Sequence, residues 1–178
     1  MTASLEDVLA FWFADPARWW KKDPAFDAEI RDRFLSLHEA IVRGEREDWL
    51  ASPRGTLAYV VVLDQFSRNM FRGTARMFAG DPRALAAARR AVDRGDDARL
   101  TDAEQGFLFM PFMHSEDMAD QDRSVALFAK RPDKDRRYAE MHRDIVRRFG
   151  RFPHRNELLG RESTPEEQDF LKQPGSAF

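Results

Sequence analysis

The sequence contains no cysteine, and this absence removes two kinds of site at once. Without thiols the chain forms neither disulfides nor thiolate metal centres, which fits a reducing compartment. Long apolar runs are also missing. The longest, Leu57–Leu63 and Phe107–Met113, fall far short of the roughly 20 residues that a membrane helix needs. The start, MTASLEDVLAFWF, has no basic leader and no small-residue cleavage site, so we expect no secretory signal and a soluble cytoplasmic protein.

An excess of charge of one sign is absent too. The formal net charge is −2 with histidine neutral, whereas dedicated nucleic-acid binders usually show a basic excess. The sequence has no glycine-rich phosphate loop, no G-x-S-x-G elbow and no serine beside a His-Asp pair, so nucleophilic catalysis has little support. We therefore predict no cofactor, and the charge argues against nucleic acid as a partner.

Signals for helices dominate what is present. Ser4 is placed to cap a first helix. Asp23 and Pro24 start a second helix, in which apolar residues recur every three or four positions until Gly44 stops it. The same signals predict further helices at about Glu47–Leu50, Leu57–Asn69, Asp81 to Gly95, Thr101 to Pro111, Asp117–Ala129, Asp133 to Gly150, and from Thr164 and Pro165 onward.

The segment Leu57–Asn69 requires a choice between helix and strand. It is apolar nearly all round and then ends in polar residues, as a buried central helix does. The β-branched residues of AYVVVL favour a strand instead, but no second convincing strand exists to pair with it. No low-complexity linker interrupts the chain. We therefore predict a single all-α domain over residues 1–178, with about eight to ten helices and no sheet.

Three segments together carry a family resemblance: LDQFSRNMFRGT, PFMHSEDMADQDRSV and FGRFPHRNELLGREST. With them, the chain resembles the bacterial domain-of-unknown-function family numbered 924 over nearly its whole length, from VLAFWF to STPEE. The resemblance implies a TPR-like α-helical fold and no particular reaction, because the activity of the family is not established. The TPR consensus of roughly 34 residues is not readable here, so any TPR likeness lies in how helix pairs pack.

The first segment supplies four candidate ligand-binding residues. Asp64 and Arg68 stand four apart on one helix, which is the spacing of an intrahelical ion pair. Asn69 follows, and Arg72 lies past the helix end, where Gly73 permits a tight turn. Guanidinium groups bind carboxylate or phosphate in fork geometry, and asparagine adds a directional amide. The alternative is structural, with Arg68 neutralising Asp64 and clasping neighbouring helices.

The second segment supplies the candidate catalytic residues. Pro111 is expected to kink or end the preceding helix, so the residues after it form a junction where side chains can converge. Histidine beside carboxylates can serve as a general acid or base, and we therefore single out His114, Glu116 and Asp117. Their spacing matches no standard ligand set, so no metal is predicted. In the structural alternative, the acidic residues favour the start of the next helix, which Ser115 is expected to cap.

The third segment concentrates basic residues around a predicted one-turn helix that starts at Pro153 and ends at Gly160. Its candidate ligand-binding residues are His154, Arg155 and Asn156. The basic character suggests binding to a nucleic-acid backbone. The surrounding chain is acidic, however, and stacking aromatics are not interleaved on an exposed face, so nucleic acid is disfavoured.

Two functional hypotheses follow. A buried arginine is costly unless a carboxylate pairs with it, so we expect the three segments to converge. Either all their arginines are paired with carboxylates, which is a structural role, or one positively charged group stays open to an anion. The leading hypothesis is a site for a small molecule that bears phosphate or carboxylate, with His114 and Glu116 as acid and base if turnover occurs. The alternative is a TPR-like scaffold that grips a protein or peptide, with Trp19 and Trp20 as anchors.

Overall fold

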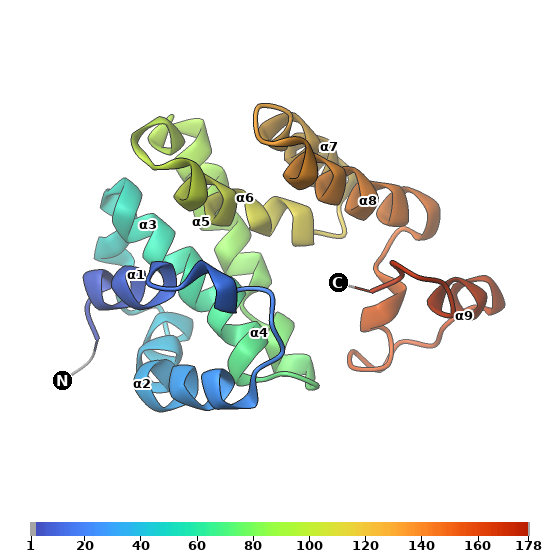
Figure 1. The fold of residues 1–178 in the computed structure, drawn as a ribbon, viewed down its shortest axis with the longest axis horizontal. Coiled ribbons are helices and arrows are strands. Elements are labelled where there is room, and N and C mark those ends of the chain that lie inside the picture. The colour runs from blue at the N-terminus through green and yellow to red at the C-terminus, as the bar shows by residue number, and fades with distance from the viewer. Residues whose placement is uncertain (1–2, 178) are drawn as a thin grey trace. The chain divides into compact units, whose positions relative to one another are not determined.

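The computed structural model describes residues 3–177 of the chain (Figure 1). All regular elements among these residues are helical and none is a strand, which confirms the all-α prediction. Within the same residues, no helix combines the length and the apolar character needed to cross a bilayer. The chain divides into two compact units, Met1–Pro111 and Phe112–Phe178, and the boundary falls inside helix α6. The expectation of one domain over the whole chain stays a prediction.

The first unit is built from helices of the α, 3₁₀ and π types. They are α1 (Leu5–Phe13), η1 (Pro16–Arg18), α2 (Pro24–Val42), η2 (Glu47–Ala51), α3 (Pro53–Val60), η3 (Val61–Phe66), α4 (Ser67–Met70), η4 (Ala75–Phe78), α5 (Asp81–Asp93), η5 (Asp96–Arg99) and the start of α6 (Asp102–His114). Side chains set the predicted starts of the first two long helices. Ser4 and Asp7 form a reciprocal capping box on α1, and Asp23 accepts hydrogen bonds from the first N–H groups of α2.

Aromatic side chains fill the core of this unit. Trp12, Phe34 and Phe66 are each at most 1% exposed. The ring of Phe66 lies 4.8 Å from that of Phe34 and meets Trp12 edge-on at 5.6 Å, between ring centroids. Contacts of this kind add about 1 kcal/mol beyond the area they bury. They fix α1 and α2 against the helix that continues from α3.

The predicted central helix is not a uniform α-helix. The segments α3, η3 and α4 follow one another without a break from Pro53 to Met70, so the helix starts earlier than the predicted Leu57. Its middle part, η3, is a π-helical turn that carries Asp64 with no exposed surface. The strand alternative for this segment is wrong. Turns of the π type occur mostly as single insertions in α-helices and often near functional sites.

The second unit comprises the end of α6 followed by α7 (Met118–Phe128), α8 (Asp133–Phe149), η6 (Pro153–Arg155) and α9 (Pro165–Leu171). The helices α7 and α8 pack against each other as a hairpin (Figure 1). Gly150 ends α8 with a φ of 70°, as predicted. A small core forms from Ile145, Val146 and Phe152, which Met118, Phe149 and Phe170 surround. This core holds the loop after α8 in place.

The junction differs from the expectation at its helix cap. Helix α6 continues through Pro111 and ends three residues later, at His114, and the expected kink at the proline stays a prediction. The cap of α7 is Asp117, not Ser115. The Asp117 δ1 oxygen accepts hydrogen bonds from the N–H groups of Ala119 and Asp120 (2.8 and 3.3 Å). The Ser115 hydroxyl instead accepts from the Asp117 N–H at 3.2 Å and donates to the carboxylate of Asp120, in the first turn of α7, at 2.7 Å.

The two neighbouring tryptophans have different environments. Trp19 packs edge-on against Phe107 at 4.7 Å and donates its indole N–H to the carbonyl of Trp12 at 2.7 Å. Trp20 lies parallel to Phe107 at 6.0 Å, yet 66% of its surface is exposed. Of the two proposed anchors, therefore, Trp20 presents a large free surface in the structure, while Trp19 is partly buried.

Candidate functional site

In the first unit, two carboxylates hold Arg68. Its guanidinium makes a bidentate pair with Asp81 at the start of α5 (2.8 and 3.0 Å) and lies 3.1 Å from the Asp64 δ1 oxygen. Burial opposes ionisation of this guanidinium, but the charges of Asp64 and Asp81 outweigh it and raise the pKa of Arg68. The predicted ion pair between Asp64 and Arg68 is confirmed. It belongs to a clasp between the central helix and α5.

Asn69 and Arg72 bind a carboxylate on α2. The Asn69 amide donates to Asp27 at 2.7 Å, and the Arg72 guanidinium makes a bidentate pair with the same carboxylate at 2.7 and 3.0 Å. Asp27 was not predicted from the sequence, because it precedes Arg72 by 45 positions and no local pattern marks it. The ligand-binding role assigned to the first segment stays a prediction. The charged partners described for Arg68 and Arg72 are carboxylates of their own unit.

In the second unit, Glu116 joins the second and third segments. It makes a bidentate pair with Arg161 (2.7 and 3.0 Å) and accepts a hydrogen bond from the Phe152 N–H at 2.7 Å. Burial raises the pKa of Glu116, yet the hydrogen bonds from Arg161 and the Phe152 N–H outweigh it and hold the pKa below its usual value. Glu116 is therefore a stable carboxylate and a poor proton donor.

Asn156 extends this network into the C-terminal part of the unit. Its side chain is fully buried; the oxygen accepts from Arg161 at 3.0 Å and the amide donates to Glu167 at 3.3 Å. Arg151 makes a bidentate pair with Glu167 (2.7 and 2.8 Å). The hydrogen bond from Arg151, helped by the Thr164 N–H, lowers the pKa of Glu167 to about 2. Asn156 thus positions the segment after α8 that carries His154 and Arg155.

Two predicted residues of the second unit, His154 and Arg155, lie against Phe152, which is fully buried, and His142 joins them there. The rings of His142 and His154 each lie 5.6 Å from the Phe152 ring, and the Arg155 guanidinium carbon lies 4.6 Å from its centroid. His114 is 6.2 Å from His142, between ring centroids. We call His114, His142, His154 and Arg155, with Phe152 between them, the Phe152 cluster. His142 was noted in the sequence only as part of a basic helix.

The chemistry of His142 reports on its surroundings. Its Nδ1 lies 2.7 Å from the carbonyl of Tyr138, which can only accept, so the Nδ1 carries the proton and Nε2 keeps a lone pair. Burial, together with the charges of His114, Arg155 and His154, lowers the pKa of His142 to about 3, although the hydrogen bond to the Tyr138 carbonyl opposes this shift. The cluster therefore creates a positive potential that keeps His142 neutral.

A buried His–Ser pair in the first unit was not predicted from the sequence. His38 Nε2 lies 2.8 Å from the Ser67 hydroxyl, and both residues are at most 4% exposed. Burial, aided by the charge of Arg76, lowers the pKa of His38 to about 4. A pair enclosed in the core has no room for a substrate, so we assign it to stability. Elsewhere among the described residues, no group of three or more His, Asp or Glu side chains is arranged to hold a metal ion.

Over the described residues, these contacts define an all-helical protein in which ion-paired arginines join neighbouring elements and a group of histidines lies beside one buried phenylalanine. The chain belongs to the family described as bacterial protein of unknown function (DUF924), whose model matches residues 8–175. It is similar to the solved structure of the protein of unknown function ATU0120 from Agrobacterium tumefaciens. The two share 46% sequence identity with a TM-score of 0.91, over 94% of this chain and 96% of that chain. Comparison with curated proteins finds no match.

The family membership predicted from the three segments is confirmed, and it assigns no reaction. The TPR-like pairing of helices stays a prediction. The expected meeting of the second and third segments is observed through Glu116 and Arg161. The convergence of Arg68 with Arg155 stays a prediction, because the two residues belong to different units.

Proposed function

We propose that the Phe152 cluster binds a small anion that carries a phosphate or carboxylate group. The observation that carries this proposal is that two imidazoles and one guanidinium lie against a single buried ring, with the imidazole of His114 beside that of His142. Groups that are positive, or can become positive, repel one another when placed together, and a bound anion relieves that repulsion. The low dielectric around Phe152 strengthens each polar contact with such a ligand.

Within this proposal the predicted residues divide into two roles. Arg155 and His154 supply the contacts to the anion, and His114, which is only partly buried, is the group to exchange a proton if the ligand is turned over. Glu116 and Asn156 position the loop, because their hydrogen bonds go to Arg161 and Glu167. Asp117 holds the start of α7 rather than contacting a ligand.

In this proposal the residues of the first segment hold helices together and do not bind the ligand. Arg68 and Arg72 form close bidentate pairs with Asp81 and Asp27, and such pairs must be broken before either guanidinium binds a ligand. We infer that these residues, with Asp64 and Asn69, clasp the helices of the first unit. A cytoplasmic location is part of the proposal, since phosphorylated and carboxylated metabolites are found there.

The test is a melting-temperature screen of the protein against phosphorylated metabolites and carboxylic acids, with inorganic phosphate and citrate as the simplest probes. A compound at a hundredfold excess over its Kd should raise the melting temperature by about 5 °C. The variants Arg155→Ala and His154→Ala should lose that rise. Arg147→Ala is the matched control, because Arg147 is an exposed arginine of the same unit that pairs with Asp144.

An equal rise in all four proteins would contradict the proposal, as would the absence of a rise with any compound. His154→Ala guards against the case in which Arg155→Ala fails to fold, because Arg155 is only 7% exposed. A negative screen would favour the alternative of a protein partner, for which the exposed Trp20 is the supporting feature. Loss of a co-purifying partner on Trp20→Ala would then be the decisive observation.

A further inference from the structure

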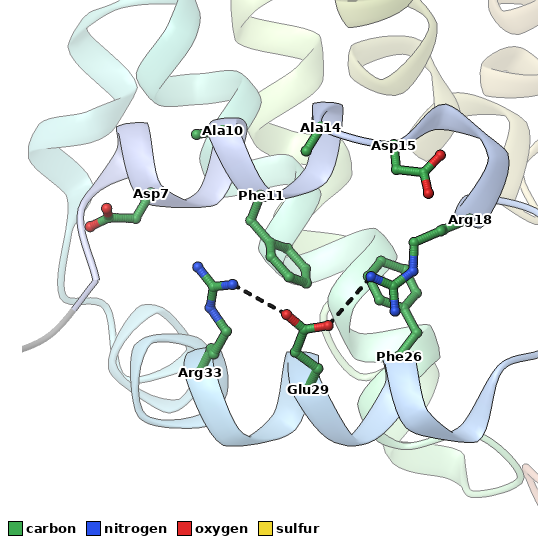
Figure 2. Close-up of a pocket in the computed structure, with 9 residues that line it drawn as sticks. All are labelled: Asp7, Ala10, Phe11, Ala14, Asp15, Arg18, Phe26, Glu29 and Arg33. Atoms are coloured by element: carbon green, nitrogen blue, oxygen red, sulfur yellow. Dashed lines mark hydrogen bonds and ion pairs between the residues drawn. The ribbon is translucent and has the colours of Figure 1, made fainter.

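A concave surface lies in the first unit, between α1 and α2, and Figure 2 shows its lining. The cleft has a volume of about 390 Å³, which is in the range of small-molecule sites. Its apolar part is formed by Ala10, Phe11, Ala14 and Phe26. Two guanidinium groups, those of Arg18 and Arg33, face each other across Glu29 (Figure 2). None of these residues belongs to the three segments discussed above.

Both guanidinium groups are preorganised by aromatic rings. The guanidinium carbon of Arg18 lies 3.9 Å from the centroid of Phe26, and that of Arg33 lies 4.5 Å from the centroid of Phe11. Stacking of this kind fixes the direction of the N–H donors before a ligand arrives. The ordering cost of binding is correspondingly reduced.

The carboxylate partner of these two arginines uses few of their donors. Glu29 gives one oxygen to Arg18 at 3.4 Å and the other to Arg33 at 3.3 Å. Charge-assisted hydrogen bonds are usually about 2.8 Å long, and each guanidinium has five N–H donors. Arg68, Arg72, Arg151 and Arg161, by contrast, each form bidentate pairs no longer than 3.0 Å. Arg18 and Arg33 therefore retain donors for an additional acceptor.

The other two acidic residues of the cleft are directed at the backbone. Asp7 accepts from the N–H and hydroxyl of Ser4 (2.8 and 2.7 Å), and Asp15 accepts from the Ala17 N–H at 3.0 Å. Their charges are partly offset by the helix starts that they cap. Asp23 adds a longer contact, 4.0 Å from the Arg18 Nη2, and the hydrogen bonds from Ser4, with the charge of Arg33, lower the pKa of Asp7. Between the two guanidinium groups themselves, Glu29 is the carboxylate that both share.

We propose that this cleft binds a small monocarboxylate with an apolar body. The ligand carboxylate would accept hydrogen bonds from the outward N–H donors of Arg18 and Arg33, in competition with Glu29. The apolar body would lie over Ala10 and Phe11 on α1 and over Ala14, which follows the helix. This inference goes beyond the proposed function, because it concerns a different unit, different residues and a ligand with an apolar part.

The test is a titration with benzoate, followed by the backbone amide signals of α1 and α2 in ¹⁵N NMR spectra. We expect shifts confined to these helices and none with benzamide, which has the same ring but no charge. Arg33→Gln should raise the Kd for benzoate at least about tenfold, the loss expected for one charge-assisted hydrogen bond. Glu29→Gln should lower the Kd severalfold, because it removes the competing carboxylate.

The opposite signs of these two changes separate a binding site from a structural ion pair, which both substitutions would only weaken. Arg83→Gln is the control, since Arg83 is exposed and lies 3.9 Å from Glu47 outside the cleft. Absence of benzoate shifts in α1 and α2, or an unchanged Kd in Arg33→Gln, would overturn the inference. Retention of benzoate binding in Arg155→Ala would show that this site is independent of the Phe152 cluster.

Discussion

The arginine side chains of this chain differ in how fully carboxylates engage their donors. Arg68 and Arg161 each meet a carboxylate through two short hydrogen bonds, while Arg18 and Arg33 share one carboxylate at longer distances. A bidentate pair in a partly buried place is costly to separate, because the partner charge is left unpaired. Residue type alone therefore does not identify a ligand-binding arginine. The number and length of its hydrogen bonds to carboxylates show whether it has donors left for a ligand.

Histidine gives a prediction for the pH dependence of stability. His38 has a pKa of about 4 in the folded protein, below its ordinary value, because burial disfavours the charged ring. Between pH 6.5 and 4 the unfolded chain binds a proton that the folded protein does not, so stability falls as pH falls through this range. His38 alone should contribute a loss of about 2 kcal/mol between pH 7 and pH 5.

Urea unfolding at pH 7 and pH 5, followed by tryptophan fluorescence, measures this loss. His38→Gln can keep a hydrogen bond to Ser67 but does not titrate. Its free energy of unfolding should therefore fall by about 2 kcal/mol less than that of the wild type between pH 7 and pH 5. Arg76 and Glu39, whose charges act on His38 in opposite directions, are unchanged in the variant. Parallel pH curves for the wild type and His38→Gln would show that His38 does not titrate as described.

Among the elements, the π-helical turn η3 carries Asp64, the buried carboxylate that pairs with Arg68. The start of α5 approaches the backbone of η3 unusually closely at Gly80. A Cβ added to Gly80, at the start of α5, would lie 2.6 Å from the carbonyl oxygen of Leu63 in η3. The backbone of Gly80 is in the right-handed region, with φ −82°, so alanine would be acceptable there on conformational grounds. The constraint on this glycine is therefore steric, and it keeps Asp81 within reach of Arg68.

Gly80→Ala should destabilise the first unit by about 3 kcal/mol, because the contact is with backbone, which has little freedom to move. Gly73→Ala is the informative comparison. Gly73 has a φ of 77° and open space around its Cβ position, so that substitution should cost only about 1 kcal/mol of conformational strain. Thermal unfolding of both variants distinguishes the two costs, and equal losses would contradict the steric explanation.

The elements themselves were largely predictable, because their ends are set by local chemistry. Ser4 and Gly150 mark a helix start and a helix end through interactions within a few residues, and both were identified correctly. Pro111 does not itself end α6, which continues to His114, so the end of this helix could be placed from the sequence only to within a few residues. The π-helical turn has no local signature comparable to a cap, and it was not predicted.

For the whole molecule, sequence reasoning identified the chemistry of the candidate sites better than their partners. The meeting of Glu116 with the third segment was expected, and its bidentate partner there is Arg161, which was not among the predicted site residues. Asp27 and Asp81, which engage the first segment, and Glu29, which lies between the arginines of the cleft, were not identified. Long-range pairing depends on how helices pack, and single residues such as these carry no periodic pattern.

The most direct test of the central claim uses the four histidines of the chain as reporters. Three of them, His114, His142 and His154, belong to the Phe152 cluster, and His38 is buried in the first unit. In NMR titrations of the imidazole signals with inorganic phosphate and with citrate at constant pH, we predict that the three cluster signals shift with one common Kd while His38 stays unchanged. Unchanged cluster signals with both probes, or a shift of His38 in step with the others, would contradict anion binding at the Phe152 cluster.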